Sequence, residues 1–280
     1  MEKNNIGEMF KGFMERVFSE NDGMSAQKDA VYNIIVLDSS GSMSAIRQAT
    51  VNGLNETLES VRQAQRQYGT TQQHYVSLLL FCGCKMEYVY ERTPIDKVRN
   101  LSPLEFRPCC GTPLYDAIGR SISDMLTSDI DLRQAAVIAT VITDGMENSS
   151  KTFTSAKARQ LVERMKNDYG WNFSYLGANH NVNEVSHGLS IDNHMSFDYS
   201  DTGASDAFRA DREARLHMIA EMHAMSEAMP DDRAKRMSII HEMLRTRRNF
   251  DNAPHDAPDD GTLSRIFHER LSRKHSTYVD

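Results

Sequence analysis

Long apolar runs are what this sequence lacks most clearly. The two longest, Val76–Phe81 and Ala135–Ile142, are each interrupted by a hydroxyl residue, whereas a membrane-spanning helix needs about 20 apolar residues. No apolar core follows residues 1–5, so the start of the chain does not resemble a secretory signal. We therefore expect a protein without a membrane span that works in the cytoplasm.

Cysteine is scarce, and positive charge is outnumbered. The four cysteines, Cys82, Cys84, Cys109 and Cys110, do not suggest a disulfide framework in 280 residues, and a chain of this length buries enough surface to fold without one. The 32 basic side chains face 39 acidic ones, giving a net charge of −7. This balance disfavours nucleic acid as the main partner, because phosphate binding needs a basic field.

Sequence motifs of several enzyme classes are also missing. The chain contains neither a Gly-x-x-x-x-Gly-Lys-Ser/Thr phosphate loop nor a Gly-x-Ser-x-Gly elbow, and it has no internal repeat. The hydrophobic fraction of 40% and the charged fraction of 25% are those of an ordinary globular protein. The sequence therefore favours a binding module over these enzyme classes.

Short apolar runs alternate with helical periodicity between residues 32 and 199. The expected strands are Tyr32–Leu37, Tyr75–Cys82, Met86–Glu91, Ala135–Ile142, Trp171–Leu176 and His194–Tyr199. The expected helices are Ile46–Tyr68, Pro113–Leu126 with Thr112 as its cap, Ser155–Tyr169 and Asn183–Gly188. This alternation predicts an α/β fold, with a Rossmann-like, mostly parallel central sheet and helices on both faces.

The segments on either side of this region do not alternate between strands and helices. We expect an N-terminal helix (Ile6–Phe18) and linker in residues 1–28, the α/β domain in 29–200, a helical hairpin in 201–250 and a linker with a terminal helix in 251–280. The hairpin should break at Pro230, and its methionines recur at helical spacing: Met218, Met222, Met225 and Met229. This stripe predicts either core packing or a docking face for a partner.

Oxygen-bearing side chains follow the ends of two expected strands and precede one helix. Asp38, Ser40 and Ser42 alternate directly after the first strand, Asp144 follows the run Ala135–Ile142, and Thr112 precedes the helix at Pro113. The carboxyl ends of parallel strands form the usual ligand edge of such a sheet. Carboxylates and hydroxyls in this arrangement suit a hard cation such as Mg²⁺.

These three loops resemble those of a von Willebrand factor A domain with a metal-ion-dependent adhesion site. The matching segments are Asp38-Ser39-Ser40-Gly41-Ser42-Met43, Gly111-Thr112-Pro113-Leu114 and Thr143-Asp144-Gly145. The run from Thr143 to Ser150, with Gly170-Trp171 and Leu176-Gly177-Ala178-Asn179, is similar to an intracellular bacterial and phage branch. The resemblance covers about residues 32–199.

The resemblance implies a metal site and a partner. Ser40, Ser42 and Thr112 would supply hydroxyl ligands to Mg²⁺ or Mn²⁺, with Asp38 and Asp144 acting directly or through water. An Asp or Glu of a partner protein would complete the site. Similar proteins accompany an ATPase, kinase or phosphatase in bacterial multi-protein systems, including stress response and phage defence. One departure is Cys110, where such domains usually carry glycine, which puts the placement of Thr112 in question.

Several alternatives remain open at this stage. The four cysteines could bind Zn²⁺, although their spacing matches no common zinc pattern, or they could be ordinary thiols. His180, His187 and His194 could form a second metal site or lie on the surface. Residues 245–248, Arg-Thr-Arg-Arg, could be a solvated helix end or contact nucleic acid. The functional alternatives to a non-enzymatic binder are a Mg²⁺-dependent phosphate-ester hydrolase and a scaffold with a vestigial metal site.

Overall fold

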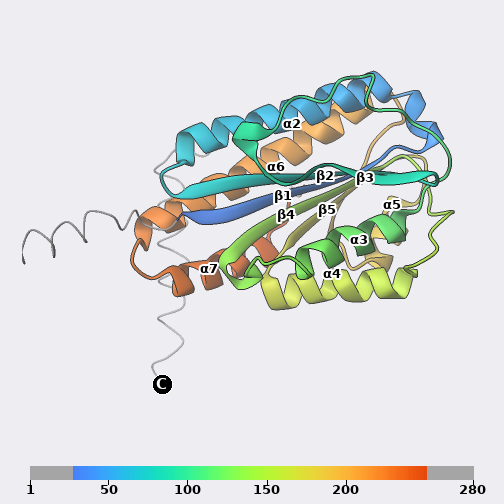
Figure 1. Ribbon diagram of the computed structural model, residues 1–280. Coiled ribbons are helices and arrows are strands. Elements are labelled where there is room, and N and C mark those ends of the chain that lie inside the picture. The colour runs from blue at the N-terminus through green and yellow to red at the C-terminus, as the bar shows by residue number, and fades with distance from the viewer. Residues whose placement is uncertain (1–27, 251–280) are drawn as a thin grey trace, which may run out of the picture.

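A six-stranded sheet forms the centre of the protein (Figure 1). The computed structural model describes residues 28–250, so the helices expected at Ile6–Phe18 and Leu263–Lys274 lie outside the described residues. The strands are β1 (Asp29–Asp38), β2 (Gln72–Cys82), β3 (Lys85–Pro94), β4 (Ala135–Thr143), β5 (Asn172–Gly177) and β6 (Asn193–Ser196), in the order β3-β2-β1-β4-β5-β6. Every neighbouring pair is parallel except β2 and β3. This confirms the expected α/β fold class.

Helices cover both faces of the sheet. The α-helices are α2 (Arg47–Tyr68), α3 (Leu114–Leu126), α4 (Ser155–Tyr169), α5 (Val182–Gly188), α6 (Asp201–Ala228) and α7 (Arg233–Thr246); short 3₁₀ turns are η1 (Gly41–Ser44), η2 (Ile95–Lys97) and η3 (Leu132–Gln134). Because strand side chains alternate between faces, Ile34 and Val36 of β1 pack against α3, α4 and α5. Ile35 and Leu37 face α2 and α6.

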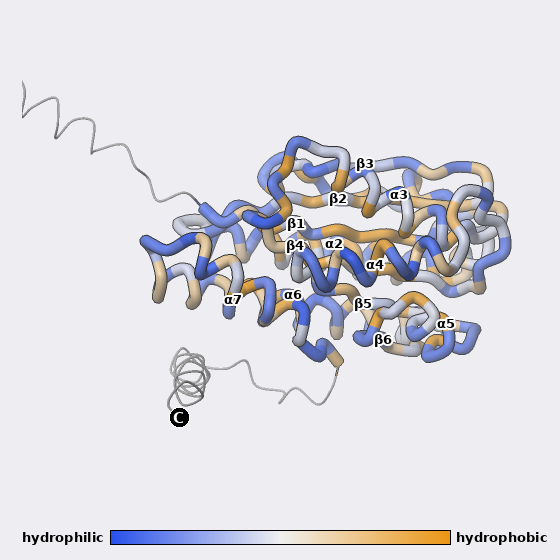
Figure 2. The backbone as a smooth tube through the Cα atoms, turned by 90° about the horizontal axis from the view of Figure 1, so that it is seen from below, coloured by the Kyte–Doolittle hydropathy of each residue, from blue (hydrophilic) through white to orange (hydrophobic). Residues whose placement is uncertain are grey.

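The central strands are buried from end to end. All nine residues of β4 and nearly all of β1 are buried, as parallel strands covered on both faces must be. Figure 2 shows the apolar stretches concentrated in these inner strands, with hydrophilic residues along the helices. The longest apolar runs of the sequence therefore mark the middle of the sheet.

The start of α3 differs from the prediction. We expected Thr112 to cap this helix and Pro113 to be its first residue. The helix begins one residue later, Pro113 takes the cap position, and no side chain caps it. The reason is that the Thr112 main chain is bonded elsewhere: its N–H donates to the Asn148 side chain, and its carbonyl accepts from the Asn148 N–H.

The methionine stripe of α6 lies in the protein core. Met218, Met222 and Met225 are buried against α7 and against Val31, Ala136 and Ile138 of β1 and β4. Pro230 separates α6 from α7, as expected. Of the two interpretations of the stripe, the structure therefore shows core packing, and the sheet supplies much of the surface that covers it.

A buried polar network lies between α6 and the sheet. The Arg215 guanidinium is fully buried and donates to Asp211, Thr140 and Asn33 side chains at 2.7–3.2 Å. His74 of β2 is buried on the same side and shares a hydrogen bond of 3.0 Å with the Gln72 side chain. Burial lowers the pKa of His74 to about 4, and the charge of Arg215 adds to this.

His74 should make stability fall in mild acid. Between pH 6.5 and 4 the unfolded chain binds a proton that the folded protein excludes, so wild-type stability should drop by about 3 kcal/mol relative to His74→Gln, whose amide stays neutral. Above pH 6.5 neither state binds the proton, and the two proteins should keep a constant difference. Urea unfolding at a series of pH values measures this, and parallel curves from pH 7 to 4 would contradict it.

Candidate metal centre

Three loops meet at the carboxyl end of the sheet. β1 and β4 are parallel neighbours, with Leu37 paired to Ile142, so Asp38 and Asp144 leave the sheet side by side. Asp38 and Ser40 are fully buried, as are Thr112 and Asp144, whereas Ser42 reaches the surface on η1. The fold thus brings together all five residues that were predicted from the sequence to be metal ligands.

Asp38 is held by both of its carboxylate oxygens. Oδ1 accepts the Ser40 N–H at 2.6 Å, and Oδ2 accepts the Thr143 hydroxyl at 2.6 Å. Burial raises the pKa of Asp38 to about 6; the Thr143 and Ser40 hydrogen bonds oppose this, and the charge of Asp144 adds to it. The two carboxyl groups lie side by side at the carboxyl end of the sheet, so the negative charge of Asp144 disfavours that of Asp38, and a bound cation would relieve this repulsion.

The hydroxyls join the first loop to the third. Ser40 Oγ and Ser42 Oγ lie 3.1 Å apart, and Ser42 Oγ donates to Asp144 Oδ1 at 2.7 Å. Burial raises the pKa of Asp144, and the Ser42 and Tyr199 hydroxyls oppose this. Its other oxygen, Oδ2, is buried and accepts no hydrogen bond of ordinary length and angle among residues 28–250. A buried oxygen of this kind calls for a cation or a water molecule.

The hydroxyls of two loops converge on Gly145. A Cβ atom added at this glycine would lie 3.2 Å from Thr112 Oγ1 and 3.8 Å from Ser42 Oγ. The hydroxyls of two loops therefore lie close together next to Asp144. With the unpartnered Oδ2 and an all-oxygen donor set, the residues present fit a hard divalent cation.

Supporting residues were not predicted from the sequence. Thr143 holds Asp38, Asn148 holds the Thr112 main chain, and the Tyr199 hydroxyl donates to the Ser42 carbonyl. Glu147 accepts the N–H groups of Tyr115, Ser149 and Ser150. Thr143, Glu147 and Asn148 belong to the run from Thr143 to Ser150 that carries part of the family resemblance. Their roles could not be predicted, because a single sequence does not show which loop each polar side chain will contact.

The second loop is fixed by main-chain hydrogen bonds. The Gly41 N–H donates to the Cys110 carbonyl at 3.0 Å, and the Cys109 N–H donates to the Ser39 carbonyl at 2.9 Å. Cys110 adopts a left-handed backbone with φ of 61°, a conformation that glycine takes without strain. Cys110, which stands where similar domains usually carry glycine, thus adopts the backbone conformation of a glycine, and Thr112 still reaches the site.

The expectation of unpaired cysteines was wrong. Cys84 and Cys110 form a disulfide, with their Cα atoms 6.1 Å apart. They are 26 residues apart in the sequence, but the turn between β2 and β3 lies against the loop before α3, where the Gly83 N–H donates to the Gly111 carbonyl. Cys82 and Cys109 remain thiols.

Comparison with known proteins supports the architecture. No protein-family model matches the sequence, and no curated protein is significantly similar to it. Among solved structures, the pilus adhesin SpaC from Lactobacillus rhamnosus GG superposes with a TM-score of 0.51 and 16% identity over 68% of this chain and 30% of SpaC. A von Willebrand factor type A protein from Catenulispora acidiphila matches with a TM-score of 0.45 and 12% identity over 68% of this chain and 43% of that one. The vWF domain of the pilus tip protein Mfa5 from Porphyromonas gingivalis matches with a TM-score of 0.49 and 10% identity, over 68% of this chain and 96% of that one.

The superposition on SpaC agrees with the sheet and helix arrangement described above. The chain has a von Willebrand factor A fold. It spans less than half of SpaC and of the Catenulispora acidiphila protein. In the von Willebrand factor A fold of residues 28–250, no helix is long and apolar enough to cross a membrane.

The three histidines do not form a second metal centre. Both ring nitrogens of His180 are hydrogen-bonded, one to the Tyr175 hydroxyl and the other to the Ala178 carbonyl. The rings of His187 and His194 contact each other edge to face. In the part of the von Willebrand factor A fold that is described, Cys84, Cys109 and Cys110 are the only group of three His, Cys, Asp or Glu residues close enough to share a metal.

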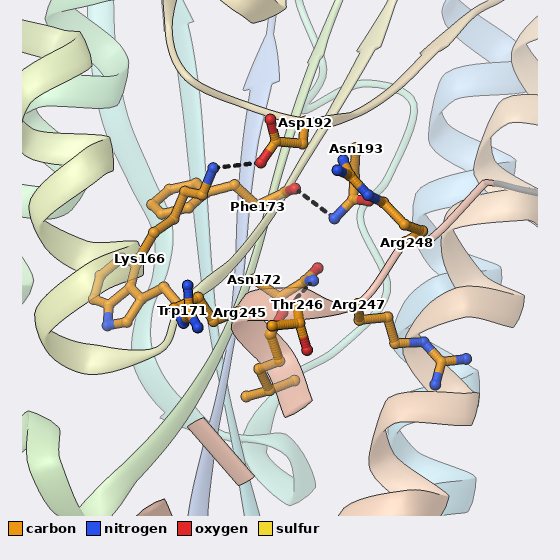
Figure 3. Close-up of a pocket in the computed structure, with 11 residues that line it drawn as sticks. Lys166, Trp171, Asn172, Phe173, Asp192, Asn193, Arg245, Thr246, Arg247 and Arg248 are labelled. Atoms are coloured by element: carbon orange, nitrogen blue, oxygen red, sulfur yellow. Dashed lines mark hydrogen bonds and ion pairs between the residues drawn. The ribbon is translucent and has the colours of Figure 1, made fainter. Parts of the chain in front are cut away.

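The basic segment at the end of α7 lines a cavity of about 330 Å³ away from these loops (Figure 3). Lys166 points across it to Asp192 at 2.6 Å. Arg245 pairs with Glu242, and Arg247 pairs with Glu221. Most of these cations are therefore neutralised by acidic neighbours, which favours a helix end over a nucleic-acid contact.

Proposed function

We propose that this protein is a metal-dependent protein-binding module. Ser40, Ser42 and Thr112 would hold Mg²⁺ or Mn²⁺ by their hydroxyls, and Asp38 and Asp144 would act directly or through water. The bound cation would offer a charge-dense anchor to an Asp or Glu side chain of a partner protein. The observation that carries this proposal is the buried Asp144 Oδ2, which accepts no hydrogen bond of ordinary length and angle among the described residues and lies in the residue next to Gly145, on which the Thr112 and Ser42 hydroxyls converge.

The rim of the site favours a protein partner. Within residues 28–250, three large hydrophobic side chains are conspicuously exposed: Leu104, Met146 and Tyr199. Met146, 63% exposed, lies two residues after Asp144, and Tyr199, 37% exposed, contacts the Ser42 carbonyl. Exposed apolar groups beside a polar anchor are typical of protein-binding surfaces, because the apolar area adds affinity that the anchor alone lacks.

The charges of the site also favour binding over hydrolysis. No Lys or Arg side chain has a hydrogen bond or ion pair with Asp38, Ser40, Ser42, Thr112 or Asp144 among the described residues. Phosphoryl transfer needs a positive clamp on the phosphate as well as a general base. We infer a non-enzymatic module, working in the cytoplasm with an ATPase, kinase or phosphatase of a bacterial multi-protein system.

Loss of the first carboxylate should weaken metal binding strongly. We expect Asp38→Ala to lower Mn²⁺ affinity by at least about 100-fold, because one of two charged groups is removed. Ser39→Ala, in the same loop but outside the proposed ligand set, is the matched control and should bind as the wild type does. Calorimetric titration of the full chain with MnCl₂ measures both, and equal affinity of Asp38→Ala and wild type would overturn the metal assignment.

The partner step is tested separately. The full chain is used as bait in extract of its native host with Mg²⁺, with EDTA, and with EDTA followed by excess Mg²⁺. A specific partner should be captured only in the first and third conditions and should be lost from Asp38→Ala. Replacing the acidic residue of the identified partner should have the same effect, whereas capture that persists in EDTA would contradict the proposal. Phosphatase activity that disappears in Asp144→Ala would instead support the hydrolase alternative.

A further inference from the structure

All four cysteines of the sequence lie together beside the candidate metal centre. Cys82 ends β2 and Cys84 lies in the following turn, while Cys109 and Cys110 are in the loop before α3. The Sγ atoms of Cys82 and Cys109 are 3.3 Å apart. The sulfurs of Cys84, Cys109 and Cys110 all lie within 4.8 Å of one another, and these three residues are exposed.

The main chain brings adjacent cysteines to one point. The turn and the loop approach so closely that a Cβ on Gly83 would lie 3.0 Å from the Gly111 nitrogen and 3.5 Å from the Cys110 Cβ. Consecutive side chains on an extended backbone point apart, but Cys110 has a φ of 61°. The sulfurs of Cys109 and Cys110 therefore lie on the same side and can reach one metal ion, although the two residues are adjacent in the sequence.

We propose that the reduced form of this cluster binds one Zn²⁺ through cysteine thiolates. Tetrahedral Zn²⁺ with bonds of 2.3 Å places its sulfur ligands about 3.8 Å apart. The Sγ atoms of Cys82 and Cys109 are 3.3 Å apart, and those of Cys84, Cys109 and Cys110 lie within 4.8 Å of one another, so small side-chain shifts would bring them to this spacing. Cys84, Cys109 and Cys110 would be the exposed ligands. Cys82, whose sulfur lies against that of Cys109, would move in as the fourth from the buried side once the disulfide opens.

Metal binding requires the disulfide to open. A dithiol reductant supplies two electrons and two protons to the Cys84–Cys110 bond, yielding two thiols and the oxidised, cyclic form of the reductant. Zn²⁺ then binds four thiolates with release of four protons, and no further redox change occurs. The disulfide and the zinc site are thus two states of one cluster.

This site differs in chemistry from the proposed Mg²⁺ centre. Sulfur ligands select a soft or borderline cation, and hydroxyl and carboxylate oxygens select a hard one. The inference does not rest on the proposed function. The two sites are nevertheless joined through the backbone, because the Cys109 N–H donates to the Ser39 carbonyl, next to Ser40.

Cobalt is the probe for the thiolate site. The full chain is reduced with dithiothreitol, desalted without oxygen and assayed for free thiols, of which there should be four. Titration with Co²⁺ should give thiolate-to-cobalt charge-transfer bands and the visible bands of tetrahedral Co²⁺, reaching a plateau at one equivalent. One equivalent of Zn²⁺ should erase these bands, and excess Mg²⁺ should leave them unchanged. Protein alkylated at its thiols is the blank.

Two variants test the ligands. Cys109→Ser and Cys84→Ser should each lower Zn²⁺ affinity by at least about 100-fold, with circular dichroism like that of the metal-free reduced wild type. Folded, fully reduced wild type without thiolate bands would overturn the inference, independently of any variant. So would bands that Mg²⁺ removes, or a rate of oxidation to disulfides that Zn²⁺ does not slow.

Discussion

Asp211→Ala is expected to lower the free energy of unfolding by about 3–5 kcal/mol, because it leaves a buried guanidinium without its counter-charge. Arg215 is fully buried, and its ion pair with Asp211 measures 3.2 Å. Asp211 also accepts the Thr140 hydroxyl at 2.7 Å. Removing the carboxylate therefore leaves both a charge and a hydroxyl of the sheet short of a partner.

A double-mutant cycle separates the ion pair from packing. Replacing both partners, Asp211→Leu with Arg215→Met, should cost clearly less than the sum of Asp211→Leu and Arg215→Met alone, since no charge is left buried. Urea unfolding measures all four proteins. Additive losses would show that the two side chains act independently, against the expectation.

Met222→Asp is expected to lower the free energy of unfolding by about 4 kcal/mol, because an unpaired carboxylate enters an apolar cluster. Met222 is buried between α6, α7 and the sheet. Met218→Asp, one turn earlier on the same face, should behave alike. The melting temperature of the purified protein measures the effect.

Met222→Leu is the matched control. A swap that conserves volume should cost less than about 1.5 kcal/mol. Were Met222→Asp to keep the wild-type melting temperature while losing only self-association or partner binding, the stripe would be a docking face in solution, contrary to its burial against Ile138 and Ile240.

The sheet was predictable because its signal is local. Strands β1 and β4 are nearly continuous apolar runs, each with one polar residue inside it, Asn33 and Thr140. Such runs are typical of parallel strands buried on both faces. The position of α6 on the sheet was harder to foresee. Its contact with β1 and β4 depends on Met218 and on Arg215 meeting Asn33, a pairing of residues far apart in sequence.

The metal-site residues were predictable from their position after strands, but their supports were not. Asp38 and Asp144 follow apolar runs that end abruptly. The hydrogen bond from Thr143 to Asp38 and that from Thr112 to Asn148 cross between loops. So does the Cys84–Cys110 bond. Which loops lie next to each other is decided by strand order, and no spacing in the sequence reveals it.

β1 is attached to other elements at both of its ends. At its start, the Asp29 carboxylate accepts two hydrogen bonds from Arg236 of α7 at 2.8 and 3.0 Å; at its end, Asp38 lies in the candidate metal centre. Between them the strand is flanked by parallel β2 and β4 along almost its whole length. A partner pulling on the Asp38 end would therefore shear two ladders of hydrogen bonds at once instead of peeling them one by one. The proposed attachment point is therefore the end of a strand that resists pulling through hydrogen bonds on both of its sides.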